Sequence, residues 1–226
     1  MSRESFLARV RQAADVGRAY RVHTKPVPEN VGYVGVDGDL CQRLAAEIDA
    51  VGGQSYLVND LDSARTMLHQ LLHEAGARPA VCWQHDLLDR LGLQNVLAAP
   101  GVKLFDYDNL LLMSPEERQS ALLACDIGIS SVDCAIAETG TLMLCSRPGQ
   151  ERLASLLPPM HVAIVERSQI VPDLLDGFQL LHEQFGTSNL PSNVTFITGP
   201  SKTGDIELQL TTGVHGPGKW RVIIIQ

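Results

Sequence analysis

The sequence predicts an α/β protein built on a mostly parallel β-sheet whose two faces are both covered. Segments with apolar residues at helical spacing alternate with short apolar runs along most of the chain. These runs are apolar at every position rather than at every second one, which is typical of strands buried on both faces. The clearest run is Val222–Ile225, which ends the predicted strand Lys219–Ile225.

The length and composition of the chain suit one domain with an N-terminal helix. Of its 226 residues, 45% are apolar and 19% are charged, so the chain can bury a core without disulfides or a structural metal. We expect residues 1–25 to form an amphipathic helix and residues 26–226 a single α/β domain. Residues 1–25 contain six basic and two acidic side chains, a charge of +4 within a chain of net charge −8. We therefore expect this helix to lie against the domain or against a partner.

Local signals then divide the domain into alternating elements, after a predicted connector at Pro26–Gly38. Gly52 and Gly53 end the first helix, Ser114–Glu117 forms a capping box, and Gly186 ends the last helix. The predicted helices cover residues 40–51, 64–76, 86–91, 114–124 and 172–186. The predicted strands cover residues 54–58, 79–83, 102–105, 126–132, 141–146, 160–166, 193–198 and 219–225.

The cysteines exclude two classes of site. The chain has five of them, an odd number with no C-x-x-C pair, so a secreted disulfide framework is disfavoured. Iron–sulfur clusters and zinc ribbons need thiolates closer together than these. We expect Cys82 and Cys145 to be buried, inert thiols, and we expect the chain to hold no cofactor of its own.

Charge and hydropathy exclude further classes of protein. The acidic balance argues against a nucleic-acid binder, which needs a basic face. The longest apolar runs are far shorter than the ~20 residues that a membrane-spanning helix needs. The basic N-terminus lacks the apolar stretch of a signal peptide, so we expect the protein in the cytoplasm.

The first candidate site is Ala137–Thr141, between two predicted strands. This turn can present polar groups to a ligand because it combines a carboxylate, two hydroxyls and a glycine. Glu138 would be the base, nucleophile or hydroxyl-binding group, and Thr139, Gly140 and Thr141 would bind the ligand. The alternative is a structural turn whose threonine and glutamate side chains bond the local backbone.

The second candidate is Thr198–Glu207, which follows a predicted strand and precedes an expected short helix. Its glycines, hydroxyls and lysine resemble an anion cradle for a phosphate or carboxylate. It is not a P-loop, since the lysine precedes the second glycine. Asp205 can equally be an ordinary acid at a helix N-terminus. The candidate ligand-binding residues are Gly199, Ser201, Lys202, Thr203 and Asp205.

The third candidate is His215, in the glycine-rich segment Gly213–Gly218 ahead of the last strand. Histidine suits proton transfer near neutral pH, so we pair His215 with Glu138 as a candidate catalytic residue. The alternative is a histidine that caps a turn. Because loops at strand ends converge in parallel sheets, we expect the three candidate segments to lie together. No metal site is predicted.

Taken in order along the chain, four segments resemble motifs of the LUD-domain family. The resemblance spans residues 2–226 and is sharpest over 126–220, and it departs from the family at Lys202 and Gly204, where arginine and alanine are usual. Within that family the chain resembles the short, cluster-free lactate utilisation proteins. The four segments are Ile136–Thr141, Leu156–Val162, Gly199–Glu207 and His215–Pro217.

The resemblance implies a Rossmann-like fold similar to the phosphosugar isomerase and CoA-transferase group. It also implies a role in oxidising L-lactate to pyruvate beside two partner subunits that carry iron–sulfur clusters. Glu138 would then orient or deprotonate a hydroxy acid, while Ser201, Lys202 and Thr203 would hold a small anionic ligand. Two alternatives stay open: a free-standing enzyme acting on a phosphorylated sugar or an acyl-CoA, and a non-catalytic assembly or regulatory module.

Overall fold

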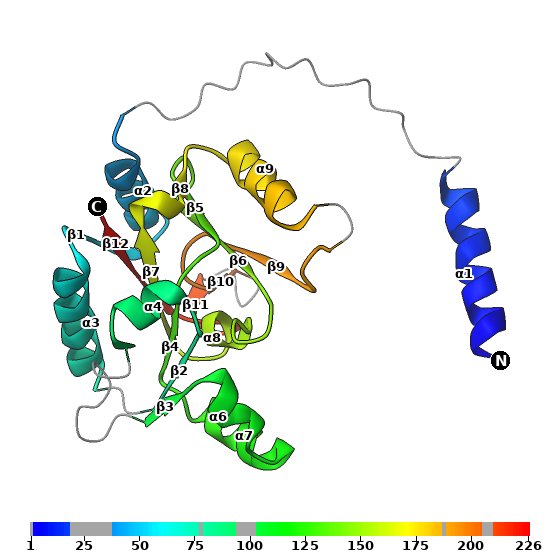
Figure 1. Cartoon of the computed structure of the whole chain (residues 1–226), viewed down its shortest axis with the longest axis horizontal. Helices are drawn as coiled ribbons and strands as arrows, with labels where there is room; N and C mark the ends of the chain where they lie inside the picture. The colour runs from blue at the N-terminus through cyan, green and yellow to red at the C-terminus, as the bar shows by residue number, and fades with distance from the viewer. Residues whose placement is uncertain (1, 19–37, 77–78, 94–102, 187–188, 205–209) are drawn as a thin grey trace. The chain divides into compact units, whose positions relative to one another are not determined.

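Figure 1 shows the computed structural model of the chain, which describes residues 2–18, 38–76, 79–93, 103–186, 189–204 and 210–226. The predicted N-terminal helix is present as α1 (Arg3–Arg18). This helix belongs to one compact unit, and the elements from α2 onward belong to a second, the α/β body. The predicted boundary at residue 25 and nearly all of the predicted connector lie outside the described residues.

The described part of the α/β body contains a six-stranded, wholly parallel sheet in the order β1-β12-β7-β4-β2-β3. Every residue of β4 is buried, as are the first six residues of β7, so both faces of the central strands are covered. This confirms the parallel α/β sheet predicted from the continuous apolar runs. The strands are β1 (Gln54–Val58), β12 (Lys219–Ile225), β7 (Met160–Glu166), β4 (Ile127–Ser130), β2 (Pro79–Cys82) and β3 (Lys103–Phe105).

Helices flank this sheet, and local signals set their ends. α2 (Leu40–Ala50) and α3 (Leu61–Ala75) pack on β1 and β12. Aspartates at the N-caps of both helices accept backbone N–H bonds, as the start of a helix requires. The capping box predicted at Ser114–Glu117 is present at the start of α7. The other helices among the described residues are α4 (Asp86–Arg90), α6 (Tyr107–Leu111), α7 (Pro115–Leu123), α8 (Leu153–Leu156), α9 (Leu174–Phe185) and the 3-10 turn η1 (Arg167–Gln169).

A second sheet departs from the single sheet that the sequence pattern predicts. Its described strands follow the order β8-β5-β6-β9, with β5–β6 and β6–β9 antiparallel. The strands predicted at 141–146 and 193–198 belong here rather than to the parallel sheet. An apolar run does not reveal its partner strand, and β5 and β8 are too short to show periodicity. The strands are β8 (Ile170–Val171), β5 (Cys134–Ile136), β6 (Thr141–Cys145) and β9 (Val194–Ile197).

The end of the second candidate segment is extended rather than helical where it is described. β10 (Lys202–Thr203) pairs antiparallel with β11 (Thr211–Thr212). The short helix expected after the lysine falls mostly on residues 205–209, which lie outside the described residues together with Asp205.

The cysteines are buried free thiols, as predicted for Cys82 and Cys145. Burial raises the pKa of both thiols to about 12, so they stay protonated at neutral pH and are inert. In the part of the chain that the structure describes, no helix is both long and apolar enough to cross a bilayer.

The close approach of α8 to β4 gives a test of the fold. A Cβ atom at Gly128 in β4 would overlap the carbonyl oxygen of Ala154 in α8. We expect Gly128→Ala to lower the free energy of unfolding by at least about 2 kcal/mol, because one of the two backbones must move. The matched control is Gly177→Ala in α9, where a Cβ atom meets only side chains at 3.4 Å or more and helix propensity favours alanine. Urea unfolding of both variants checks this, and equal midpoints would contradict it.

Candidate functional site

Two of the three predicted segments meet at one cavity of about 200 Å³. Its walls include Thr198, Gly199 and Ser201 from the second segment and His215 from the third. Backbone hydrogen bonds hold the two segments together, since the N–H of Ser201 donates to the carbonyl of Pro217 (2.9 Å). Folding therefore brings together two of the three segments that we expected to meet.

The first segment reaches this cavity through a chain of hydroxyl groups. The Oγ1 atoms of Thr139 and Thr141 lie 2.7 Å apart, and Oγ1 of Thr141 lies 2.7 Å from Oγ1 of Thr198. Gly140 has a φ of 63° and lies against the backbone of α2 at Glu47, where a side chain would not fit. The segment thus connects the end of β9 with α2 beside the cavity wall.

Glu138 is not among the described residues that line this cavity. Its backbone N–H donates to the carbonyl of Pro172 (3.0 Å), and the residue is half-buried. The structure therefore does not place Glu138 and His215 on one cavity wall. His215 itself is exposed, at the rim of the cavity.

Lys202 is already engaged at the end of a helix. Its Nζ donates to the carbonyl of Val51, just past α2, at 2.6 Å. A cation there stabilises the negative end of the helix dipole. An ammonium group has three N–H donors, and this bond uses one of them. Thr203 is half-buried in β10, beside Lys202.

The deep wall of the cavity contains two residues that the sequence analysis missed, His161 and Trp220. His161 is fully buried, with its Nε2 atom 2.8 Å from the Oγ atom of the equally buried Ser130. Burial lowers the pKa of His161 to about 3, so its ring is neutral at pH 7. The sequence contained one signal for this pair: His161 is a polar residue near the start of the apolar segment Met160–Glu166, and Ser130 ends the apolar segment Ile127–Ser130.

Strand register places these buried groups on one face of the parallel sheet. Trp220 of β12 is the register partner of His161 of β7, and Gly128 of β4 is its partner on the other side. Ser130 lies two residues beyond Gly128, so it points to the same face. Both His161 and Trp220 are second residues of their strands, so the cavity lies at the amino ends of β7 and β12. Ligands of open α/β sheets usually bind at the carboxyl ends.

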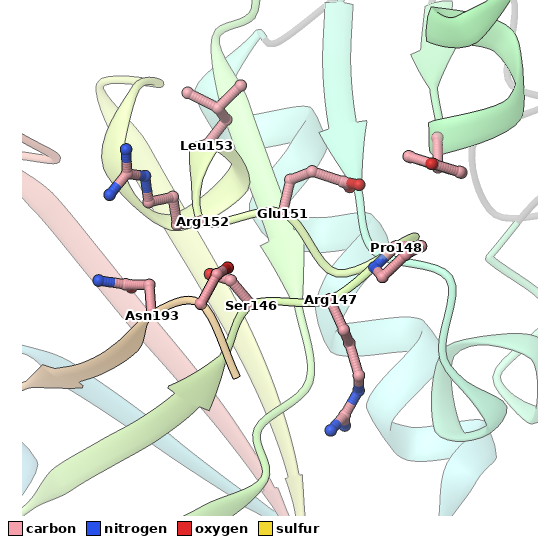
Figure 2. Close-up of a pocket in the computed structure, with 9 residues that line it drawn as sticks. Ser146, Arg147, Pro148, Glu151, Arg152, Leu153 and Asn193 are labelled. Atoms are coloured by element: carbon pink, nitrogen blue, oxygen red, sulfur yellow. The ribbon is translucent and has the colours of Figure 1, made fainter. Parts of the chain in front are cut away.

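A second, larger cavity of about 530 Å³ lies beside the loop that follows β6. Figure 2 shows its lining residues, with Arg147, Glu151 and Arg152 extending in different directions. Arg147 donates to Asp133 (2.7 Å), whose side chain is only 1% exposed. The guanidinium groups therefore do not converge on one point, and one of them already neutralises a buried carboxylate. The sequence analysis singled out none of these residues.

Within the described ranges, no group of three or more histidine, cysteine or acidic side chains is arranged to hold a metal ion. The expectation that this chain carries no cofactor stays a prediction.

Comparisons with known proteins agree with this fold. A family model described as LUD domain matches residues 41–225. The chain is 30% identical to lactate utilization protein C of Geobacillus sp. (strain WCH70), covering 99% of this chain and 95% of that protein. It is 33% identical to the protein of that name from Halalkalibacterium halodurans, covering 74% and 70%. A crystal structure of a DUF162 family protein from Deinococcus radiodurans covers 83% of this chain and 96% of its own, with a TM-score of 0.57 and 19% identity.

The buried His161 predicts a specific dependence of stability on pH. Its folded pKa of about 3 lies below the unfolded value of about 6.5, so only the unfolded state takes up a proton between these values. The stability that depends on this ring is complete above pH 6.5 and is lost as the pH falls toward 3. Between pH 6.5 and 4.5 the loss is about 2–3 kcal/mol.

Urea unfolding of the wild type and of His161→Gln at pH 7 and pH 4.5 measures this contribution. The glutamine amide can still bond Ser130 but does not titrate, so we expect the variant to lose less stability on acidification. Equal losses in both proteins would contradict the assignment.

Proposed function

Since this chain belongs to the LUD-domain family, we propose that it takes part in lactate utilisation, as a subunit of an assembly that oxidises L-lactate to pyruvate. The observation that supports this is the near full-length similarity to proteins named lactate utilization protein C. The LUD-domain family model matches residues 41–225, which include all three candidate segments.

We propose that the electrons removed from lactate leave through partner subunits. Oxidation of a hydroxy acid to an oxo acid releases two electrons and two protons, and iron–sulfur clusters on the partners would accept the electrons. The cysteines of this chain are buried and protonated, which suits a structural role in the core. Free thiols also suit the reducing cytoplasm, where we propose that the assembly works.

We further propose that α1 contacts a partner. Its apolar stripe includes Phe6 and Val10, with exposed fractions of 56% and 49%, and arginines flank that stripe. A helix with this pattern suits an apolar groove with an acidic rim.

Within the α/β body, the small anionic ligand would be held at the cavity of the second and third segments. Ser201 lines that cavity, and Lys202 and Thr203 follow it in the chain. Glu138 of the first segment is not among the described lining residues of this cavity, so it would orient or deprotonate the hydroxy acid from outside the cavity, and His215 would exchange protons at the rim. If these residues are structural instead, the chain is an assembly module.

Reconstitution tests the proposed role. The tagged chain is purified from cells grown on L-lactate, together with the iron–sulfur proteins that bind it. Lactate-dependent dye reduction is then measured for these partner proteins, once with the chain present and once without it. We expect reduction to require the chain and its deletion to abolish growth on lactate. Equal rates in both mixtures, with normal growth of the deletion strain, would contradict the proposal.

Glu138→Gln separates a catalytic subunit from an assembly module. A general base contributes about 10²–10⁴-fold, so we expect a loss of lactate oxidation in that range with the complex still formed. Glu183→Gln, on the exposed side of α9, is the matched control and should keep full activity. Unchanged activity of Glu138→Gln would show that the segment is structural.

A further inference from the structure

We propose that the cavity of about 200 Å³ binds a small carboxylate, of the size of a three-carbon hydroxy or oxo acid, through the buried ring nitrogens of His161 and Trp220. The choice of acid rests on the proposed function, whereas the site itself rests on the geometry of these two residues.

Both side chains carry a buried nitrogen with no hydrogen-bond partner among the described residues. These atoms are Nδ1 of His161 and Nε1 of Trp220. Buried polar groups in native proteins are nearly always paired, so two such atoms at one cavity indicate a partner that the chain itself does not supply. Register pairing puts the two residues side by side on adjacent strands, facing the same way.

Packing fixes the orientation of the indole. A side chain at Gly53 would clash with Cε3 of Trp220, so that edge of the ring lies against the backbone after α2. Nε1 is on the opposite edge of the indole. It can only donate a hydrogen bond, so its partner must be an acceptor.

Ser130 determines what His161 offers to the cavity. The neutral ring has one N–H and one acceptor nitrogen. Within the described residues the buried Ser130 hydroxyl has only Nε2 of His161 as a partner, so its proton is satisfied only when it donates to that nitrogen. We assign the ring proton to Nδ1 on this ground. His161 and Trp220, which both line the cavity, then carry two unpaired N–H donors on adjacent strands, and the two oxygens of one carboxylate can accept both.

The size and charge of the cavity select the ligand. Its volume holds roughly six to seven water-sized groups, which matches a three-carbon acid more closely than a sugar phosphate or an acyl-CoA. The titratable side chains among the described residues that line it are His161 and His215. No acidic lining residue in that part of the chain repels a carboxylate, although the whole chain has a net charge of −8. A phosphate dianion would lack the cation that it needs.

The hydroxyl groups around the opening complete the recognition of a hydroxy or oxo acid. Ser201 and Thr198 also line the cavity, and each can donate to or accept from the second functional group of the acid. Thr198 is held by Thr141, so the first candidate segment positions this wall.

The two tryptophans of the chain make the test direct. Trp220 reports on the proposed site, whereas Nε1 of Trp83 donates to Glu151 beside the larger cavity (2.9 Å). In ¹H–¹⁵N spectra of the isolated chain, titration with L-lactate or pyruvate should shift the Trp220 indole signal in a saturable way. The Trp83 signal should stay in place. Lactamide, the neutral analogue, and inorganic phosphate should bind at least about tenfold more weakly.

Two variants test the donors themselves. Trp220→Phe removes Nε1, and His161→Gln keeps a partner for Ser130 but removes Nδ1. We expect each to raise the dissociation constant for pyruvate about tenfold or more. The matched control Trp83→Phe should bind pyruvate as the wild type does, with Trp220 as its only indole signal.

Three outcomes of the titration would overturn the proposal. A shift of Trp83 alone places the acid in the larger cavity. Equal binding of lactamide or phosphate removes the carboxylate preference, and no shift of either signal at millimolar acid means that water satisfies the two nitrogens. The test is separate from that of the proposed function: a Trp220 shift without a requirement for the chain in lactate oxidation would leave the site standing and the function wrong.

Discussion

The close approach of α8 to β4 is the constraint on which the cavity depends. Gly128 has no side chain, so the carbonyl of Ala154 can lie directly on the strand. This contact positions Ser155 and Leu156 of α8 as one wall of the cavity, on the face that Ser130 and His161 occupy. The glycine, the serine and the histidine thus form one packed unit, and the position of Trp220 follows from the pairing of β12 with β7.

Much of this architecture could be predicted from the sequence because burial on two faces leaves a strong signal. The run Val222–Ile225 and the segment Met160–Glu166 are apolar at nearly every position, and both are central strands. The second sheet could not be predicted, since β5 and β8 are three and two residues long and pair through contacts far along the chain. Sheet membership is a tertiary property that a local pattern does not contain.

The candidate site could likewise be predicted only in part, because some of its residues stand out in the sequence and others matter only through contacts made in the folded chain. Glycines and hydroxyls mark the segments at Gly199–Ser201 and at His215, and folding brings these two together. His161 was missed because it lies within an apolar strand, where one polar residue is read as a tolerated exception. Its significance depends on Ser130, 31 residues away, and on the atom that lacks a partner.

The proposed neutral anion site suits the proposed role of this chain as a subunit that is expected to handle substrate without a cofactor of its own. A site built from arginines would bind carboxylates tightly at any pH, and tight ground-state binding does not accelerate a reaction. Neutral N–H donors bind a carboxylate more weakly, and the strands that carry these donors fix the orientation of the bound acid. The low pKa of His161 keeps this ring neutral across the physiological range, so the deep wall of the proposed site stays uncharged. Lys202, held at the end of α2, then stabilises the loop beside the cavity instead of supplying charge inside it.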